Sequence, residues 1–320
     1  MIDITSKEER QLLVDVSVLY YLEGKTQSEI AKELYLSRPK VSRLLKKARE
    51  QHVVDITINY QSDEIEKLQG EIRRKFNVDK VVIVKTLTDK KDTLEEIGKI
   101  AAKELETEIK EGMTIGFSWG KSVRCAASYL KRKKVENVKI VELFGAISYD
   151  RNDDDMLSIG RSISSKVGGK LYPLPAPIYI HDKIARKALI ETPLINNTLN
   201  MIDNCDLIIS GLGVVDNDSL QPIWDNYVEK DKKHRIKEMG GVGFMCAQFF
   251  DENGQFLDDD INSSVIGIKN ENIKKIRSMV IAGGKSKVRA ILGALRGGCI
   301  NILISDEGTL KSVLEYDKEI

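Results

Sequence analysis

The stretch KTQSEIAKELYLSRPKVSRLLKKAR, residues 25–49, predicts two short helices joined by a tight turn. Apolar residues at helical spacing give each helix one apolar face: Ile30, Ala31 and Leu34 in the first, Val41, Leu44 and Leu45 in the second. Ser37 is a good N-cap for the second helix, and Pro39 is tolerated in its first turn. Tyr35 stands at the turn, where such motifs often have glycine. This arrangement is typical of a helix-turn-helix.

The second helix of this motif has a basic outer face. We expect Arg38, Lys40 and Ser42 to reach base edges or nearby phosphates, and Arg43, Lys46 and Lys47 to contact mainly phosphates. The candidate DNA-contacting residues are Gln27, Ser37, Arg38, Lys40, Ser42, Arg43, Lys46 and Lys47. The alternative is a solvated basic face on a structural helix.

Composition bounds the class of protein. The chain has 320 residues, 42% of them hydrophobic and 31% charged, with a formal net charge of +1. DNA affinity must therefore come from a local basic patch rather than from the whole surface. No apolar run is long enough for a transmembrane helix, and the N-terminus lacks a secretory pattern, so we expect a cytoplasmic protein with no membrane partner. The cysteines and histidines are too widely separated for a metal site, and we expect no cofactor.

Periodicity divides the chain. We expect a helix-turn-helix domain over residues 1–60, with an amphipathic helix at Ser6–Leu22 and a strand, possible as a wing, at Val53–Asn59. Residues 61–320 should hold a linker helix and an effector-binding and oligomerisation domain. The apolar seam of the helix Ser62–Phe76 favours equally a dimer contact and packing on the chain's own large domain.

Beyond Asn77, strands and helices alternate, which predicts a doubly wound α/β domain with its ligand beyond the carboxyl ends of the strands. The expected strands are Lys80–Val84, Thr114–Ser118, Val138–Leu143, Asp206–Gly211, Met279–Ala282 and Asn301–Ser305. The expected helices are Thr93–Ile109, Lys121–Lys131, Met156–Val167, Ile184–Glu191, Lys285–Leu295 and Thr309–Glu315.

Glycine-rich loops follow several of these strands. Gly116–Ser122 (GFSWGKS) ends a strand and opens a helix, so its amides form a natural anion site. The loop is one residue short of a P-loop, and it also spells G-x-S-x-G, the hydrolase nucleophile pattern, for which Asp206 or Asp225 and then His234 would supply the triad order. Plain tight turns are the remaining interpretation. A second glycine loop with lysine, Gly283–Lys287, favours a phosphate, and Asp251 suits a sugar hydroxyl.

Ordered motifs along nearly the whole chain resemble the SorC family of sugar-responsive bacterial transcription regulators. They are QSEIAKELYLSRPKVSRLLKKARE, IGFSWGKSV, VELFGAIS, LYPLPAPIYI, ISGLGVV, VGFMCAQFFDENG and VIAGGKSKVRAILGALRGGCINILISDEGT. The resemblance implies an N-terminal DNA reader, an effector domain similar to sugar-phosphate isomerases and CoA transferases, and a tetramer built as a dimer of dimers on operator DNA.

The resemblance also implies an effector pocket. Ser118, Gly120, Lys121 and Ser122 match the family's phosphate-side loop, and Asp251 and Lys287 match ligand-contacting residues. Phe144 is a departure, because relatives that sense deoxyribose phosphate have there a lysine that forms a Schiff base. The candidate effector residues are Ser118, Gly120, Lys121, Ser122, Phe144, Gly145, Gly211, Gly213, Asp251, Gly283, Gly284 and Lys287. The acidic run Asp153–Asp155 either touches the ligand or favours a helix start.

The sequence therefore predicts a transcription regulator of a carbohydrate-metabolism operon, controlled by a phosphorylated sugar or polyol, and not an enzyme. The rival is a sugar-phosphate isomerase-like enzyme, which needs a general base, with Asp251 as the one candidate in a ligand loop. A third possibility is an effector domain that serves only for oligomerisation.

Overall fold

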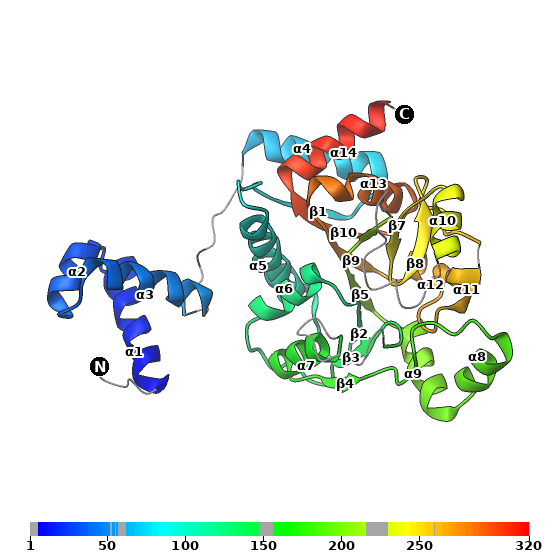
Figure 1. The fold of residues 1–320 in the computed structure, drawn as a ribbon, viewed down its shortest axis with the longest axis horizontal. Helices are drawn as coiled ribbons and strands as arrows, with labels where there is room; N and C mark the ends of the chain where they lie inside the picture. Colours follow the sequence, from blue (N-terminus) through cyan, green and yellow to red (C-terminus); the bar gives the residue numbers. More distant parts are fainter. Residues whose placement is uncertain are drawn as a thin grey trace. The chain divides into compact units, whose positions relative to one another are not determined.

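A computed structural model describes residues 6–51, 53, 54, 56, 62–146, 156–215, 230–258 and 260–319. The chain divides into two compact units, Met1–Asn59 and Tyr60–Ile320 (Figure 1). The expected strand at Val53–Asn59 and the acidic run Asp153–Asp155 lie largely or wholly outside the described residues. No helix of the described ranges is both long and apolar enough to cross a membrane.

The first unit is helical. It contains α1 (Ser6–Ser17), which continues as a π-helical turn (Val18–Leu22), α2 (Gln27–Glu33) and α3 (Arg38–Glu50). Thr26 and Glu29 form a reciprocal capping box at the start of α2, and Ser37 caps α3 by accepting from the amide of Lys40. The inner faces pack into one core: Leu13, Val16, Leu19, Ile30, Ala31, Val41, Leu44, Leu45 and Ala48. These local signals were readable in the sequence, and the helix-turn-helix is confirmed.

Tyr35, between α2 and α3, has a φ of 53° and a side chain that is 96% exposed. The turn thus needs the left-handed conformation that glycine usually supplies, and tyrosine adopts it with its ring in solvent.

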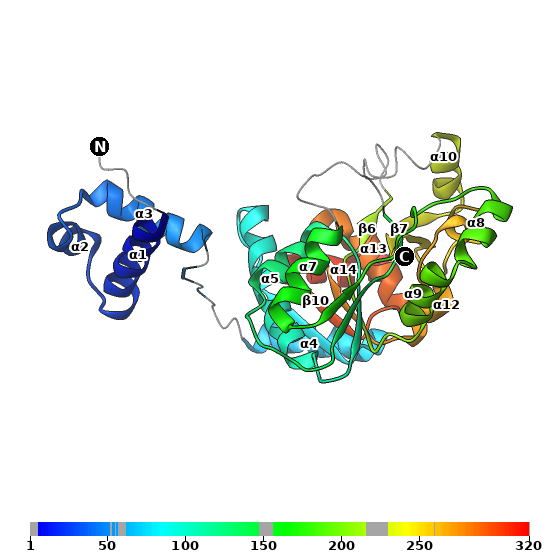
Figure 2. The same cartoon turned by 90° about the horizontal axis from the view of Figure 1, so that it is seen from below.

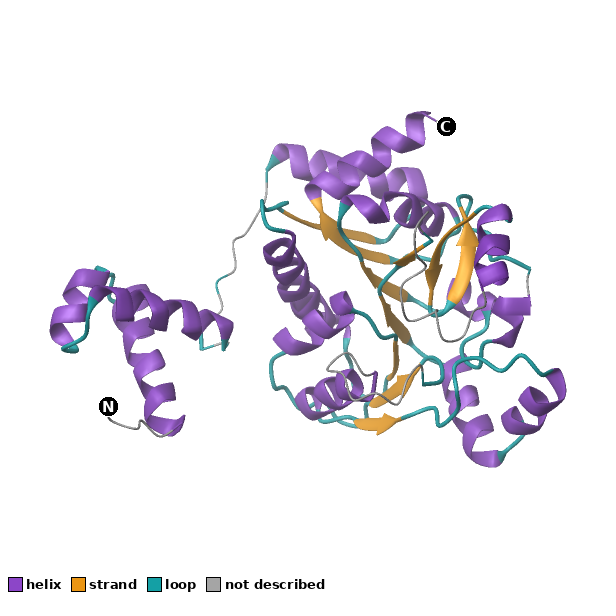
Figure 3. Cartoon of the chain, in the orientation of Figure 1, coloured by secondary structure: helices purple, strands orange, loops and turns teal. Residues whose placement is uncertain are grey.

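The second unit is built on a parallel sheet with the strand order β1-β10-β9-β5-β2-β3-β4. Its strands are β1 (Lys80–Val84), β2 (Thr114–Phe117), β3 (Lys139–Glu142), β4 (Lys170–Tyr172), β5 (Leu207–Ser210), β9 (Ser278–Ile281) and β10 (Ile302–Asp306). The central strands are buried on both faces, which explains their continuous apolar runs. Figure 3 shows the strands of this sheet among the helices of the unit. The chain first adds β3 and β4 on one side of β2 and then β5, β9 and β10 on the other, so the order reverses between β2 and β5.

Helices cover both faces of the sheet, which makes the domain doubly wound as predicted. One face carries α5 (Lys90–Glu108), α6 (Lys121–Tyr129) and α7 (Met156–Val167), which contact each other in turn. The other face carries α4 (Asp63–Phe76), α9 (Pro193–Asp203), α13 (Val288–Arg296) and α14 (Glu307–Glu319). The pair α8 (Lys183–Ile190) and α9 lies at the end of the unit far from α5 (Figures 1 and 2).

An antiparallel sheet, not predicted from the sequence, packs against α13. It has the order β6-β7-β8, with β6 (Gly213–Val214), β7 (Gly241–Met245) and β8 (Gln248–Asp251). Short helices accompany it: α10 (Lys230–Glu238), α11 (Asp260–Ser264) and α12 (Asn270–Lys275). Strands this short carry too little alternation to be recognised without their partners.

The helix α4 packs on its own domain. Ile65, Leu68 and Ile72 are buried in the large core, and α4 contacts β1 and α14. Of the two readings left open for this apolar seam, the structure therefore supports internal packing.

Candidate functional site

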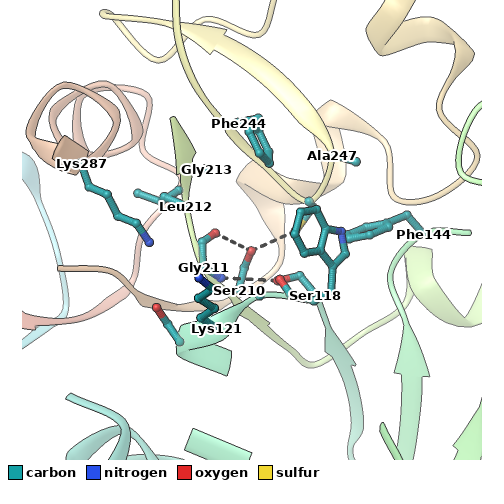
Figure 4. A pocket seen from close by; sticks show the side chains of 14 residues that line it. Ser118, Lys121, Phe144, Ser210, Gly211, Leu212, Gly213, Phe244, Ala247 and Lys287 are labelled. Carbon is teal, nitrogen blue, oxygen red and sulfur yellow. Dashed lines mark hydrogen bonds between the residues drawn. The ribbon is translucent and has the colours of Figure 1, made fainter. Parts of the chain in front are cut away.

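A cavity of about 490 Å³ opens at the carboxyl ends of β2 and β5, where the strand order reverses. Parallel α/β sheets bind ligands at this switch point, because loops of neighbouring strands diverge there. The lining residues come from several loops: Ser118, Trp119, Gly120, Lys121, Ser122, Phe144, Ser210, Gly211, Leu212, Gly213, Phe244, Cys246, Ala247 and Lys287 (Figure 4).

One side of the cavity is the start of α6. Its N-cap, Gly120, has a φ of 138° and offers no side chain to the first amides of the helix. Those amides and the positive end of the helix dipole therefore remain available to an anion. Lys121 and Ser122 add an ammonium group and a hydroxyl at the same point.

Lys287 approaches from the opposite side. It ends a 3₁₀ turn, Lys285–Lys287, just before α13, rather than lying inside the predicted helix Lys285–Leu295. Gly284 precedes this turn with a φ of 101°, and its amide donates to the carboxylate of Asp306 at 3.1 Å and to the hydroxyl of Thr309 at 2.7 Å. The buried Asp306 thus holds the loop that carries Lys287.

The two lysines make the cavity electropositive. Burial, and secondarily the charge of Lys121, lowers the pKa of Lys287 to about 8. No carboxylate is among the described residues that line the cavity with Lys121 and Lys287. Lys287 extends toward Gly211 and Lys121 in Figure 4, so a single anion can be reached by both.

Hydrogen bonds between loops set the floor of the cavity. The amide of Gly211 donates to the hydroxyl of Ser118 at 3.4 Å, and the hydroxyl of Ser210 donates to the carbonyl of Gly211 at 2.8 Å (Figure 4). The Ser118 hydroxyl also donates to the carbonyl of Trp119. The Gly211–Ser118 bond joins the β2 and β5 loops, and the other two bonds lie within one loop each.

An apolar wall faces the lysines. The rings of Trp119 and Phe144 meet edge to face with centroids 6.5 Å apart, and Phe144 is only 1% exposed. Phe244 covers Gly213, where a Cβ would lie 1.9 Å from its ring. The wall suits the carbon skeleton of a small ligand.

The turn between β7 and β8 completes this wall. Cys246 and Ala247 have φ values of 50° and 66°, so two non-glycine residues adopt the left-handed conformation that a two-residue hairpin requires. Such backbone strain is often found at binding sites. Burial raises the pKa of the Cys246 thiol to about 12, which keeps it neutral.

Several expected residues lie elsewhere. Asp251 ends β8, about 13 Å of extended chain from Ala247, and its carboxylate accepts from the amides of Asn253 and Gln255, both at 2.9 Å. It shapes a turn and does not line the cavity. Gly145 and Gly283 are also outside the lining, and a Cβ at either would clash with neighbouring atoms. Gly284 does not line the cavity either, but its hydrogen bond to Asp306 holds the loop that carries Lys287.

Other lining residues were missed in the sequence: Trp119, Ser210, Leu212, Phe244, Cys246 and Ala247. Trp119 lies inside the glycine loop Gly116–Ser122 that was singled out, so its position was a usable signal. Phe244, Cys246 and Ala247 belong to the unpredicted hairpin, which only tertiary packing brings to the cavity.

Six of the eight DNA-contacting candidates lie on α3; Ser37 is its N-cap, and Gln27 begins α2. Arg38, Lys40, Ser42, Arg43 and Lys46 are exposed on α3, while Gln27 and Lys47 are partly buried. Lys47 forms an ion pair with Glu9 of α1, so its charge also serves the unit's own packing.

Comparison with known proteins identifies both units. The family described as "Putative sugar-binding domain" matches residues 61–315, and region 4 of sigma-70, a helix-turn-helix region, matches residues 6–51. The chain is 26% identical to the crystal structure of the full-length sorbitol operon regulator SorC from Klebsiella pneumoniae, which superposes with a TM-score of 0.73 and covers 96% of this chain and 99% of that one. This chain belongs to the SorC family of transcription regulators.

Curated relatives agree with this membership. The erythritol catabolism regulatory protein EryD of Brucella abortus is 29% identical over 300 residues, covering 92% of this chain and 94% of the relative. The deoxyribonucleoside regulator of Bacillus subtilis is 27% identical over 310 residues, covering 96% and 98%. The SorC-family chain is thus a DNA-binding regulator with a sugar-binding domain and not an enzyme.

The residues named for the enzyme alternatives do not meet at the cavity. Asp251, the base named for an isomerase, ends β8 and does not line the cavity. His234 of the hydrolase reading is exposed on α10 and pairs with Glu238 at 3.3 Å, and Asp225 lies outside the described residues.

Proposed function

We propose that the protein regulates a carbohydrate-metabolism operon in response to a phosphorylated sugar or polyol that binds at the carboxyl ends of β2 and β5. The observation that carries this proposal is the meeting of Lys121 and Lys287 at the uncapped start of α6. A phosphate there would gain two ammonium partners and free backbone amides, and its charge would offset the effects of burial and of the Lys121 charge, which together lower the pKa of Lys287.

The rest of the cavity suits a small carbon skeleton. Ser118, Ser122 and Ser210 offer hydroxyls, and the aromatic wall of Trp119 and Phe144 offers an apolar face. Phe144 cannot form a Schiff base, so binding here is non-covalent at that position. The relatives named for erythritol, sorbitol and deoxyribonucleosides make sugars and polyols the compounds to test.

Regulation follows from a difference in affinity. We infer that the cytoplasmic protein forms a homotetramer, a dimer of dimers, that sets the spacing of paired helix-turn-helix units on operator DNA, in keeping with the family resemblance. The effector then favours one arrangement by the difference between its affinities for the two states.

The test is a thermal-shift series on the full chain with phosphorylated sugars and their unphosphorylated parents. A ligand that binds the folded state raises the Tm by mass action. We expect a shift with a phosphorylated compound, lost in Lys287→Met. Lys285→Met, in the same turn but exposed and outside the cavity, is the matched control and should keep the shift. Equal increases in Tm for wild type and Lys287→Met would show that the phosphate does not bind in this cavity.

A further inference from the structure

Basic side chains gather at the edge of the parallel sheet that lies opposite the cavity, at the amino ends of β3 and β4. They come from the loop after α6, from the end of α7 and from the starts of the two strands. The segments 131–139 and 166–170 hold seven basic residues and one acidic residue, Glu136, in a chain whose formal net charge is only +1. The basic edge consists of residues 131–134, Lys139, Lys166 and Lys170.

Backbone hydrogen bonds bring these segments together. The amide of Lys133 donates to the carbonyl of Lys166 at 2.9 Å, so the loop after α6 meets the end of α7. The amide of Lys170 donates to the carbonyl of Val138, also at 2.9 Å, and α7 contacts both β3 and β4 (Figure 1). Residues from three parts of the chain therefore form one basic surface.

The end of α6 does not account for the basic loop. Cations after a helix are normally explained by the helix dipole and by the free carbonyls of the last turn. Here the ammonium group of Lys166, on α7, donates to the carbonyls of Ala127 and Ser128 in the last turn of α6. The exposed side chains of residues 131–133 are thus not needed to cap that helix.

Little of this positive charge is neutralised within the two segments. Their one acid, Glu136, pairs with Lys134 at 2.8 Å. The neighbouring carboxylate of Glu106 accepts from the backbone amide of Lys131 at 2.7 Å. The other six basic residues have no acid within the segments that carry them.

The two strands add a pair of like charges. Lys139 and Lys170 are register partners at the starts of β3 and β4, and both are exposed. Partners in register point to the same face of a sheet, so their ammonium groups repel each other. A row of negative charges along this edge would replace that repulsion with attraction.

We propose that the basic edge is a second DNA-contacting surface, which binds the phosphate backbone of duplex DNA in addition to the helix-turn-helix. Duplex DNA is already a partner of this regulator, and it carries about one negative charge per 1.7 Å of its axis, so it suits a surface with several spaced cations. Lysine and arginine contacts to phosphates carry no sequence information. The basic edge therefore adds affinity and salt dependence, and the choice of operator stays with the helix-turn-helix.

The experiment is fluorescence anisotropy of the full chain with a random-sequence DNA duplex several helical turns long, at several salt concentrations. Lys131, Arg132 and Lys133 are replaced together by glutamine. We expect the slope of log affinity against log salt concentration to fall by up to about 2.7, because each lost phosphate contact removes about 0.9. A retained Tm shows that the variant is folded.

A matched control removes the same charge elsewhere. Lys183→Gln, Lys187→Gln and Lys275→Gln together neutralise three exposed lysines of α8 and α12. This variant has the same net charge as the first, and its slope should equal that of wild type.

A pair on the strands protects the test if the loop variant does not fold. Lys139→Gln with Lys170→Gln should lower the slope by up to about 1.8 and should keep the Tm, because it also relieves a repulsion. Three results would overturn the proposal: a wild-type slope in both basic-edge variants; an equal fall in the control, which would mean a general effect of net charge; or an unchanged DNA slope with binding to anionic vesicles that the same substitutions abolish, which would make this a membrane surface.

Discussion

At the scale of single residues, the two lysines of the cavity, Lys121 and Lys287, lie at the starts of helices, each shortly after a glycine. Gly120 and Gly284 both adopt positive φ, and at neither would a Cβ meet an atom within 4 Å, so the conformation rather than crowding requires glycine. Asp306 then fixes the second loop by accepting from Gly284, Thr309 and Thr86. The geometry concentrates positive charge where no described carboxylate neutralises it.

The lowered pKa of Lys287 predicts a pH-dependent affinity. Below its pKa of about 8 the free protein holds a charged ammonium, and above it the group must take up a proton to pair with a phosphate. We therefore expect affinity for a phosphorylated ligand to fall as pH rises above about 8, a trend that calorimetric titration across pH can measure. In Lys287→Met this fall should disappear, and an unaltered pH profile in that variant would contradict the assignment.

The lowered pKa of Lys287 also affects the stability of the unliganded protein, and there the trend with pH is the opposite one. Between about pH 8 and 10.5 the unfolded chain keeps the proton on Lys287 that the folded chain has released. The free energy of unfolding should therefore rise with pH across this window, and less steeply in Lys287→Met. Chemical denaturation at several pH values in the absence of ligand would show it.

At the scale of elements, α3 is a stable scaffold with a separate outer face. Its buried residues belong to the core of the first unit, and its basic side chains other than Lys47 are exposed. Substitution of an outer residue should therefore change DNA binding and leave folding intact.

Arg43→Ala tests this division. We expect weaker binding to all DNA sequences and a salt slope reduced by about 0.9, because one phosphate contact is lost. Arg10→Ala, exposed on α1, is the control and should bind with wild-type affinity. Fluorescence anisotropy at several salt concentrations gives both quantities, and an unchanged slope for Arg43→Ala would refute its role at a phosphate.

The helix α4 offers a second prediction at this scale. Ile72 is fully buried against the large domain, so Ile72→Ala should lower the free energy of unfolding by about 2–5 kcal/mol. Urea denaturation of the full chain measures the loss. Sedimentation should meanwhile show an unchanged oligomeric state, whereas a dissociated but equally stable protein would restore the dimer-seam interpretation.

At the scale of the whole molecule, the helix-turn-helix and the cavity of Lys121 and Lys287 lie in different compact units. Such a regulator works only if the two binding equilibria are coupled, and the coupling must be reciprocal. Whatever factor the phosphorylated effector applies to operator affinity, the operator must apply to effector affinity. Titrating each in the presence and absence of the other should return the same factor, and a factor of one in both directions would show that this effector does not control DNA binding.

The sequence by itself determined the elements whose signals are local. Capping residues and apolar periodicity located α2 and α3, strand β1 was predicted with its observed bounds, and the glycine loops at Gly120 and Gly284 were recognised. These features depend on residues a few positions apart, so they can be read along the chain.

Only the tertiary structure decided which loops share a cavity. Ser118 and Gly211 meet across 93 residues of sequence, the β7–β8 hairpin brings Cys246 and Ala247 to their wall, and β8 carries Asp251 away to a turn. Packing likewise decided that α4 covers its own domain. Such choices follow from strand order and from contacts between distant segments, which no local pattern encodes.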